Sequence, residues 1–470
     1  MDDTFDAIVI GSGQAGPALA ERFSKAGWRT AVIERHRFGG TCVNTGCIPT
    51  KALVASAHVA SLLRRGAEYG ISVPSGAQVD FPAVMARKSR IAGRSRESVE
   101  KWLRGMPGVT VVQGHARFEA PGQIRVGDRL LESERIFLNV GGRANDLAPE
   151  IANGVRTLNN SSLLALDSLP EHLAVIGGSY VGLEFAQMFR RFGARVTVLQ
   201  RGAQIVPRED ADVAAAVQAI LEHDGVEIRT GTECFALRQE GERIAVRWRC
   251  GDDHDEFLCT HVLNATGRRP NTDDLGLENT GVKRDPRGYI EVDDQLRSSA
   301  KGIWAMGDCN GRGAFTHTAY NDFEIVAANL LDSDARRVSD RMSAYALYTD
   351  PPLARIGLTV DEALRSGRPT LIGELPMSRV GRAVQKGEEQ GFLRVLVDTQ
   401  TRHLVGATLL GVEADEAVHA LLTLMYARQP VDTVQRAVFI HPTVSELLPT
   451  VLGSLRPLQP LQPLEASQPS

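Results

Sequence analysis

The stretch "AIVIGSGQAGPALAERFSKAGWRTAVIER", from Ala7 to Arg35, decides the fold. An apolar run ends in glycines, an amphipathic segment follows, and a second apolar run ends at Glu34. Gly11, Gly13 and Gly16 have the spacing G-x-G-x-x-G, which lets the backbone turn tightly and approach a pyrophosphate at the start of a helix. Glu34 can accept both hydroxyls of a ribose. The pattern predicts a βαβ unit that binds a dinucleotide.

The same pattern recurs in "HLAVIGGSYVGLEFAQMFRRFGARVTVLQR", from His172 to Arg201. Gly177 and Gly182 take the outer glycine positions, and Ser179 takes the middle one. Two such units predict two dinucleotides, and a flavin with a nicotinamide is the pair that an oxidoreductase would need. The chain is therefore expected to be an α/β protein with two Rossmann-like domains, one for FAD and one for NAD(P).

The two units differ at the end of their second strand. Gln200 and Arg201 stand where the first unit has the acidic Glu34. Without a carboxylate there, the 2′-phosphate of NADP is not repelled, and Arg201 or Arg208 can bind it. This favours NADPH, whereas NADH remains the alternative if Arg201 is only a solvated side chain.

Two later stretches end predicted strands in polar turns. "NATGRRPNT", residues 264–272, contains Gly267, and "GIWAMGDCN", residues 302–310, contains Gly307 and Asp308. Because ligands bind at the carboxyl ends of strands in open α/β sheets, both turns are expected to return to the cofactors.

The character of the chain changes at about Asp350. "GFLRVLVDTQTRHLVGATLLG" alternates like an antiparallel hairpin, and "ADEAVHALLTLMYAR" has a helical pattern, which together predict a separate α+β domain. The Pro- and Gln-rich end is expected to be disordered. The predicted order is an FAD-binding domain (1–150), an NAD(P)-binding domain (151–270), a return segment completing the FAD site (271–340), the C-terminal α+β domain (341–456), to which the family resemblance given below assigns dimerisation, and the tail (457–470).

Composition excludes several other classes. The 470 residues have a net charge of -4, which argues against nucleic acid or a membrane surface as a partner. The acidic N-terminus does not resemble a secretory signal, and no apolar run is expected to reach the roughly 18 residues of a membrane span. Six cysteines are too few for a disulfide scaffold in so long a chain. A cytoplasmic protein with small-molecule partners is expected.

Two of those cysteines are placed together in "GGTCVNTGCIPTK", from Gly39 to Lys51. Cys42 and Cys47 have four residues between them, which is not the spacing of a zinc site, and no metal site is expected. A helix is predicted to start beside Pro49, and a helix N-terminus lowers a thiol pKa. The pair is therefore interpreted as a redox-active disulfide beside the flavin, with two buried structural cysteines as the alternative. Packing roles are expected for Cys234, Cys250, Cys259 and Cys309.

With these motifs, the chain resembles the flavin-dependent pyridine nucleotide-disulfide oxidoreductases, such as dihydrolipoamide dehydrogenase, glutathione reductase and mercuric reductase. The likeness runs from Phe5 to about Leu455 and includes "GGTCVNTGC", both βαβ fingerprints, "ATGRRPN", "GDC" and "HPTVSE". It implies a homodimer that contains FAD, with Gly40 and Thr41 at the cofactor and Asp308 holding the ribityl chain.

The resemblance also implies roles at the reacting centre. Cys42 would meet the substrate and Cys47 would face the flavin. Lys51 would pair with Glu184 beside the flavin ring. The histidine that acts as acid and base would be His441, which reaches the disulfide from the partner subunit and is oriented by Glu446. Alternatively, His441 is a surface histidine and Lys51 with Glu184 an ordinary surface ion pair.

Three functions remain open from the sequence. The first is NAD(P)H-dependent reduction of a disulfide, a thiol-bound metal or a related oxidant, because "FTHTAYNDFEIVAANLL" and "YTDPPLARIGLT" look most like reductases between mercuric reductase and the copper-reducing enzyme of reactive-chlorine resistance. The second is dihydrolipoamide dehydrogenase, which Gln200 disfavours, and the third is a flavoprotein redox sensor or binding partner. The basic segment 86–104 is interpreted as a solvated helix, with guidance of an anionic substrate as the alternative.

Overall fold

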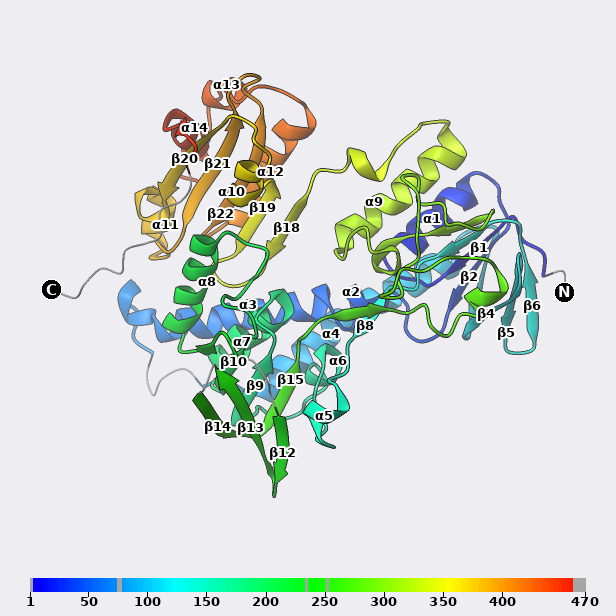
Figure 1. The fold of residues 1–470 in the computed structure, drawn as a ribbon, viewed down its shortest axis with the longest axis horizontal. Helices are drawn as coiled ribbons and strands as arrows, with labels where there is room; N and C mark the ends of the chain where they lie inside the picture. Colours follow the sequence, from blue (N-terminus) through cyan, green and yellow to red (C-terminus); the bar gives the residue numbers. More distant parts are fainter. Residues whose placement is uncertain (1–2, 74–77, 233–235, 251–252, 460–470) are drawn as a thin grey trace. The chain divides into compact units, whose positions relative to one another are not determined.

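The computed structural model describes residues 3–73, 78–232, 236–250 and 253–459 (Figure 1). The chain folds as two compact units. The N-terminal unit contains Met1–Arg64, Val73–Arg201 and Thr232–Arg341, and the C-terminal unit contains Arg65–Ser72, Gly202–Gly231 and Met342–Ser470.

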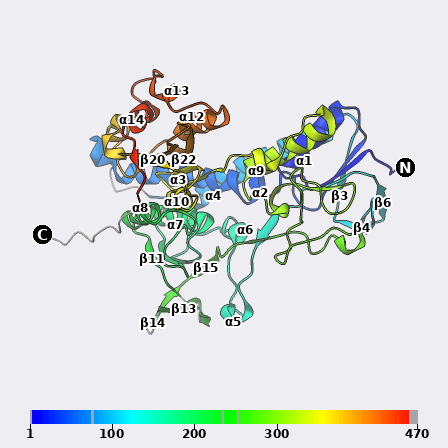
Figure 2. The same cartoon turned by 45° about the horizontal axis from the view of Figure 1, so that its top comes forward.

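The N-terminal unit is built around a parallel five-stranded sheet. Its central strand β1 is entirely buried, because its apolar residues are covered on both faces. Helices α1 (Ala15–Lys25) and α9 (Thr316–Ala327) lie side by side on this part of the unit (Figure 2). The strands, in spatial order, are β17 (Ile303–Ala305), β7 (Ile136–Leu138), β1 (Ala7–Ile10), β2 (Thr30–Glu34) and β3 (Val109–Gln113).

A second parallel sheet in this unit carries the second βαβ pattern. Strand β9 (His172–Ile176) lies between β10 (Arg195–Leu199) and β15 (His261–Asn264). Helix α7 (Tyr180–Phe192) joins β9 to β10. Smaller antiparallel sheets are formed by β4 (Ala116–Ala120), β5 (Gln123–Val126) and β6 (Arg129–Glu132), by β12 (Ala236–Glu240), β13 (Arg243–Cys250) and β14 (Asp253–Cys259), and by β8 (Gly142–Ala144) with β16 (Arg268–Pro270).

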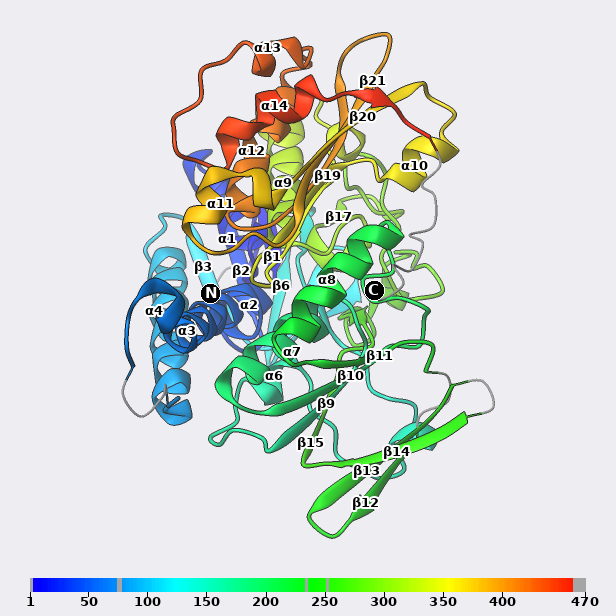
Figure 3. The ribbon, with the colours of Figure 1, turned by 90° about the vertical axis from the view of Figure 1, so that its left-hand side faces the viewer.

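Helix α3 (Cys47–Arg64) packs between α4 (Phe81–Arg104) and α7 (Figure 3). Asp80 caps α4 by accepting a hydrogen bond from the Ala83 N–H at 3.0 Å. The basic segment lies on α4, but it is not solvated throughout: Lys88 is 8% exposed and donates to the Leu164 carbonyl. The interpretation as a solvated helix is therefore wrong for this residue, because its amino group is buried against the Leu164 carbonyl.

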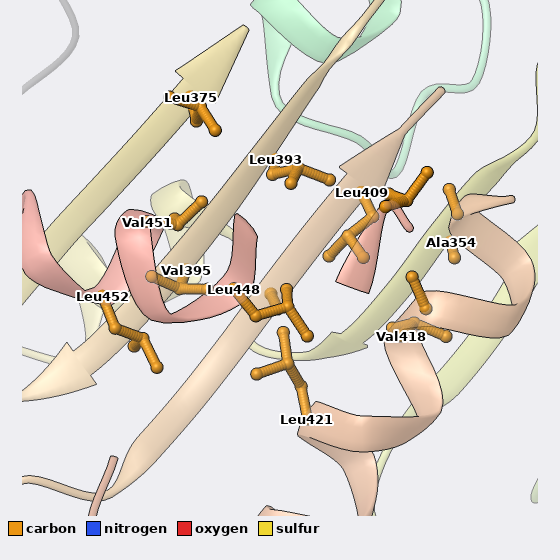
Figure 4. Packing of buried hydrophobic residues seen from close by; sticks show 14 of the residues in the cluster. Ala354, Leu375, Leu393, Val395, Leu409, Val418, Leu421, Leu448, Val451 and Leu452 are labelled. Carbon is orange, nitrogen blue, oxygen red and sulfur yellow. The ribbon is translucent and has the colours of Figure 1, made fainter. Parts of the chain in front are cut away.

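The C-terminal unit has a six-stranded antiparallel sheet. The predicted hairpin is confirmed as β21 (Phe392–Asp398) and β22 (Leu404–Leu410), and the predicted helix as α12 (Ala414–Tyr426). Leucine and valine side chains of α12 and α14 (Leu448–Gly453) pack on these strands (Figure 4). The other strands are β18 (Ala344–Leu347), β19 (Leu353–Gly357), β20 (Thr370–Pro376) and β23 (Arg456–Pro457), and the other helices are α8 (Ala211–His223), α10 (Val360–Arg365), α11 (Gly381–Gln385) and α13 (Asp432–Gln435).

A buried ion network crosses this unit. Arg355 on β19 is 1% exposed, and its guanidinium donates to Glu209 at 2.8 Å, Asp210 at 2.9 Å and Thr408 at 2.8 Å. Asp210 also accepts the Val360 N–H at 3.1 Å, at the start of α10. The network fixes the stretch 202–231 within the C-terminal unit, although that stretch follows the second βαβ pattern in sequence.

The predicted fold class is confirmed by this mixture of two parallel sheets and an antiparallel C-terminal domain. One expectation needs correction: Pro457 pairs with Leu371, so the start of the segment expected to be disordered is a strand. Residues 460–470 of that segment lie outside the described residues, as do Cys234 and the side chain of Cys250. Cys259 and Cys309 are buried.

One helical stretch of the described residues, Gly40–Arg64, is long and apolar enough to cross a membrane, with a mean hydropathy of 1.3. The expectation that no stretch meets these limits is corrected by this finding. A single such helix is weak evidence, because core helices meet the same limits, and α3 carries Lys51 in an ion pair with Glu184 of α7.

Candidate active site and cofactor sites

The first glycine turn connects β1 to α1 and is held by Asn139, which follows β7. A Cβ at Gly11 would lie 2.3 Å from the Asn139 carbonyl oxygen, and φ at Gly11 is +105°. A Cβ at Gly16 would lie 2.3 Å from the Gly11 oxygen. Packing of the chain itself therefore requires both glycines. Gly13 differs, because a Cβ there would make only an ordinary contact, 3.4 Å from Asn139 Nδ2. The absence of a side chain at Gly13 fits a bound group that approaches the backbone, as a dinucleotide pyrophosphate does.

This difference makes a prediction about Gly13→Ala and Gly11→Ala. Gly13→Ala should leave the free energy of unfolding of the apoprotein nearly unchanged and weaken FAD binding by about tenfold or more, about 1.4 kcal/mol. Gly11→Ala should destabilise the apoprotein by more than about 1 kcal/mol, because of its positive φ. Urea unfolding and FAD titration of the apoproteins measure the two effects. Parent-like FAD affinity in Gly13→Ala would show that this turn does not face a pyrophosphate.

The Glu34 carboxylate is fixed at the end of β2. Its Oε2 accepts from the Ser12 N–H at 3.0 Å and the Ser12 hydroxyl at 2.6 Å, and its Oε1 accepts from the His36 N–H at 2.8 Å. A carboxylate offers about four acceptor positions, so hydroxyls of a ribose can still bind.

The second turn repeats this design with other side chains. A Cβ at Gly177 would lie 2.5 Å from the Ala265 oxygen, and a Cβ at Gly182 would lie 2.1 Å from the Gly177 oxygen. Ser179 precedes α7, and its side chain does not cap the helix. Gln200 Oε1 accepts the Gly178 N–H at 2.9 Å, the contact that Glu34 makes with Ser12 in the first turn. The position keeps its hydrogen bond but loses the negative charge, and Arg201 beside it is exposed.

The two return turns lie in the same N-terminal unit. Gly267 follows β15, and its φ of +132° places its carbonyl to accept the Asn145 N–H at 3.0 Å. Gly307 and Asp308 begin a 3₁₀ turn (Gly307–Asn310) directly after β17. Burial raises the pKa of Asp308, and the positive charge of Arg268 opposes this shift only in part. Such a carboxylate is suited to accept hydroxyls of a ligand.

The two cysteines lie on consecutive helices. Cys42 belongs to α2 (Gly40–Asn44), which begins with Gly40 and the exposed Thr41, and Cys47 is the first residue of α3. Both are free thiols in this structure. A hydrogen bond from Cys42 lowers the pKa of Cys47 to about 6, helped by the Thr316 hydroxyl and the positive charge of Lys51. The same hydrogen bond, together with burial, raises the pKa of Cys42. The negative charge of the dithiol is therefore placed on Cys47, and Cys42 needs a base before it can attack.

Thr316, at the start of α9, was not among the candidate residues from the sequence. Its hydroxyl oxygen lies 3.0 Å from Cys47 Sγ, although the two residues are far apart in the chain. Only the hydroxyl can donate when Cys47 is a thiolate, so Thr316 stabilises the charged form. Asn139 was missed in the same way. Its only sequence signal was its place at the end of a predicted strand.

Thr316→Val is expected to raise the pKa of Cys47 by about one unit, equivalent to about 1.4 kcal/mol, since it removes the donor and keeps the shape. When the pH is lowered, the Cys47 thiolate of the variant should therefore take up a proton at a higher pH than the thiolate of the parent. Ultraviolet thiolate absorbance of the reduced protein, followed against pH, measures this shift, with the exposed helix residue Thr423→Val as the control. An unchanged midpoint in Thr316→Val would contradict the role of the hydroxyl.

Lys51 and Glu184 form an ion pair across α3 and α7. Lys51 Nζ lies 2.7 Å from Glu184 Oε2, and the side chains are 34% and 8% exposed. The carboxylate is largely buried, so the pair differs from the ordinary surface pair that the sequence left open. It holds a positive charge one helical turn from Cys47.

His441 and Glu446 belong to the C-terminal unit. His441 Nδ1 donates to Glu446 Oε2 at 2.8 Å, which leaves Nε2 as the nitrogen that can exchange a proton with another group. The imidazole is 78% exposed and Glu446 is 16% exposed. Val438 and Ile440 just before it are 99% and 80% exposed. An apolar, protruding segment of this kind is typical of a surface that a partner covers.

The described residues contain no group of three or more His, Cys, Asp or Glu side chains that could hold a metal ion. They do contain two glycine turns of the dinucleotide-binding type, after β1 and β9, and the Cys42–Cys47 dithiol. The side-chain-free backbone at Gly13, the fixed Glu34 and the carboxylate of Asp308 fit an FAD. Fold and site together define a nicotinamide- and flavin-dependent oxidoreductase with a redox-active cysteine pair.

Comparison with known proteins gives the same class. The model of the pyridine nucleotide-disulphide oxidoreductase family matches residues 5–322, and the dimerisation domain of that family matches residues 343–452. The chain belongs to this family, whose members use FAD and a pyridine nucleotide, and its dimerisation domain indicates a homodimer.

Three relatives cover nearly the whole chain. The probable pyridine nucleotide-disulfide oxidoreductase RclA of Escherichia coli (strain K12) is 34% identical over 94% of this chain and 98% of its own. A dihydrolipoyl dehydrogenase of Chlamydia pneumoniae is 31% identical (95% and 96%), and a mercuric reductase of Streptomyces lividans is 32% identical (94% and 94%). The solved Cu(II) complex of RclA, described as an HOCl-induced flavoprotein disulfide reductase, aligns with a TM-score of 0.87, 33% identity and coverage of 96% and 99%.

Proposed function

We propose that this protein is an NADPH-dependent flavoprotein reductase whose Cys42–Cys47 pair delivers electrons to a small disulfide or to a soft metal ion held by thiols. The observation that carries the proposal is the setting of the cysteine pair: Cys47 begins α3, its Sγ lies 3.0 Å from the Thr316 hydroxyl, and Lys51 follows one turn later, a setting that favours negative charge on Cys47. The names of the relatives, a mercuric reductase and a disulfide reductase solved with Cu(II), support these two substrate classes.

Bound FAD would supply the two-electron transfer from NADPH that converts the Cys42–Cys47 disulfide into the dithiol. Cys42, deprotonated by His441 of the partner subunit, then attacks one sulfur of the substrate disulfide. A mixed disulfide forms, and the first thiol leaves with the proton that His441 holds. Cys47 attacks Cys42, which restores the Cys42–Cys47 disulfide and releases the second thiol. Lys51 provides positive charge near Cys47, and Glu446 orients the imidazole of His441.

The first test is an anaerobic titration of the purified protein with NADPH, followed in the visible spectrum. A long-wavelength thiolate-to-flavin band at two electrons per flavin supports Cys47 beside the oxidised flavin. Bleaching of the flavin without that band would contradict the proposal and favour a redox sensor. Steady-state rates with a small disulfide and with a Cu(II)–thiol complex then separate the two substrate classes. Faster oxidation of dihydrolipoamide with NAD than either reduction would favour a dihydrolipoyl dehydrogenase.

NADPH specificity is tested by Gln200→Glu. The new carboxylate should repel the 2′-phosphate and lower kcat/KM for NADPH by about tenfold or more, about 1.4 kcal/mol, while the value for NADH stays the same or rises. Gln385→Glu, on the exposed end of α11, adds the same charge elsewhere and serves as the control. An equal change in kcat/KM for NADPH and NADH in Gln200→Glu would show that this position does not discriminate between nucleotides with and without the 2′-phosphate.

A further inference from the structure

Asp322 on α9 is a buried carboxylate that the proposed reaction does not use. Its side chain is 2% exposed. Asp322 Oδ2 accepts the Gly307 N–H at 2.7 Å and the Asn310 side-chain amide at 2.9 Å. It therefore binds the first and the last residue of the 3₁₀ turn that contains Asp308.

Arg341 holds the other oxygen of Asp322. One arm of its guanidinium donates to Asp322 Oδ1, and its Nε donates to the Asn321 side chain at 2.8 Å. The Arg341 side chain is 11% exposed, so the ion pair is largely removed from water. The hydrogen bonds thus run in a chain from Arg341 through Asp322 to Gly307.

Asp308 lies directly after the residue that this chain of hydrogen bonds fixes. Gly307 has a φ of +71°, in the region that favours glycine, so the turn needs outside contacts to keep one conformation. A buried ion pair is often no more stabilising than apolar residues of the same size, and the best-attested use of buried polar groups is to specify one arrangement. The arrangement specified here is that of the turn that presents Asp308.

We propose that Asp322 and Arg341 are positioning residues for FAD. Asp322 holds the Gly307–Asn310 turn so that the Asp308 carboxylate meets the ribityl hydroxyls, and Arg341 holds Asp322. The inference rests on the proposed function as an FAD enzyme and on Asp308 as a residue that holds this FAD, and it adds two residues that do not touch the cofactor.

The test compares FAD dissociation constants of reconstituted apoproteins, measured by quenching of flavin fluorescence. Asp322→Asn and Arg341→Met should each weaken FAD binding by about tenfold, about 1.4 kcal/mol. Asp322→Glu should restore part of the affinity. Arg336→Met, which removes an exposed pair with Glu324 on the same segment, should bind FAD like the parent. Parent-like affinity in Asp322→Asn would overturn the proposal.

Two further measurements separate the possible failures. Urea unfolding of the apoproteins reports a merely structural role: a loss of apoprotein stability with unchanged FAD affinity overturns the proposal. If Arg341→Met does not fold, Arg341→Gln removes the charge that pairs with Asp322 and keeps a polar side chain, so parent-like FAD affinity in that variant overturns the role of Arg341. Asp308→Asn tests whether Asp308 itself contributes to FAD binding, on which the inference depends. Unchanged affinity in Asp308→Asn means that the assignment of Asp308 itself fails, whereas a loss in Asp308→Asn alone means that only this inference fails.

Discussion

Changing Cys42 to serine is expected to lower the reduction of a disulfide or a thiol-bound metal by about 10³-fold or more, as the loss of a catalytic nucleophile generally does. In the proposed reaction Cys42 is the thiol that attacks substrate, and its raised pKa in the dithiol means that a base must first remove its proton. Serine keeps the shape but is a far weaker nucleophile at neutral pH. Reduction of the flavin by NADPH does not use Cys42 and should persist, which stopped-flow absorbance measures.

The Cys42→Ser variant has an internal control, because transfer of electrons from NADPH through the flavin to an artificial dye should be retained. Cys259→Ala, at a buried thiol away from the dithiol helices, controls for general effects of cysteine removal. Full turnover of substrate by Cys42→Ser would show that the pair is structural.

The second large effect is expected for His441→Gln. Loss of a general acid and base costs about 10²–10⁴-fold in kcat/KM. Glu446→Gln should cost less, because it disturbs the orientation of the imidazole at Nδ1 and leaves Nε2 in place. Steady-state kinetics against pH distinguish the two variants. Parent-like rates in His441→Gln would show that His441 is a surface histidine without a role in the reaction.

Mixed dimers show in which subunit His441 acts. A dimer of one Cys42→Ser chain and one His441→Gln chain has one dithiol that faces an intact histidine only if His441 works across the interface. Mixing the two inactive variants should then restore part of the parent activity. No restoration in a verified mixed dimer would place the histidine in the same chain as its cysteines, or outside the reaction.

The local patterns of the sequence were sufficient for most of the fold. Both βαβ units and the C-terminal hairpin depend on residues that are close in the chain, so periodicity and glycine spacing could predict them. The glycine turns also pointed to Glu34 and Gln200, since each closes a strand at a fixed distance from its turn. The resemblance contributed pairs that local patterns do not contain, such as Lys51 with Glu184.

The residues that were missed depend on tertiary contacts. Thr316 meets Cys47, and Asn139 meets Gly11, only because strands and helices from distant parts of the chain end at the same place. Lys88 lies in a basic run that looks solvated, yet it is buried and donates to the Leu164 carbonyl, 76 residues along the chain. No pattern in one sequence reports such contacts, because a polar residue beside a turn has the same composition whether or not it faces the site.

The Arg355 network has a consequence for how this protein can be divided and recombined. The family domains meet between residues 322 and 343, yet Glu209 and Asp210 lie far upstream and contact Arg355. A chain shortened to its first family domain would leave the carboxylates of Glu209 and Asp210 without Arg355. Breaking a buried ion pair in this way lowers the free energy of unfolding by about 3–5 kcal/mol. Exchange of dimerisation domains between relatives should therefore succeed only when residues 202–231 are exchanged together with the domain. The part of this protein that can be exchanged as a unit is thus encoded by two separate stretches of its gene.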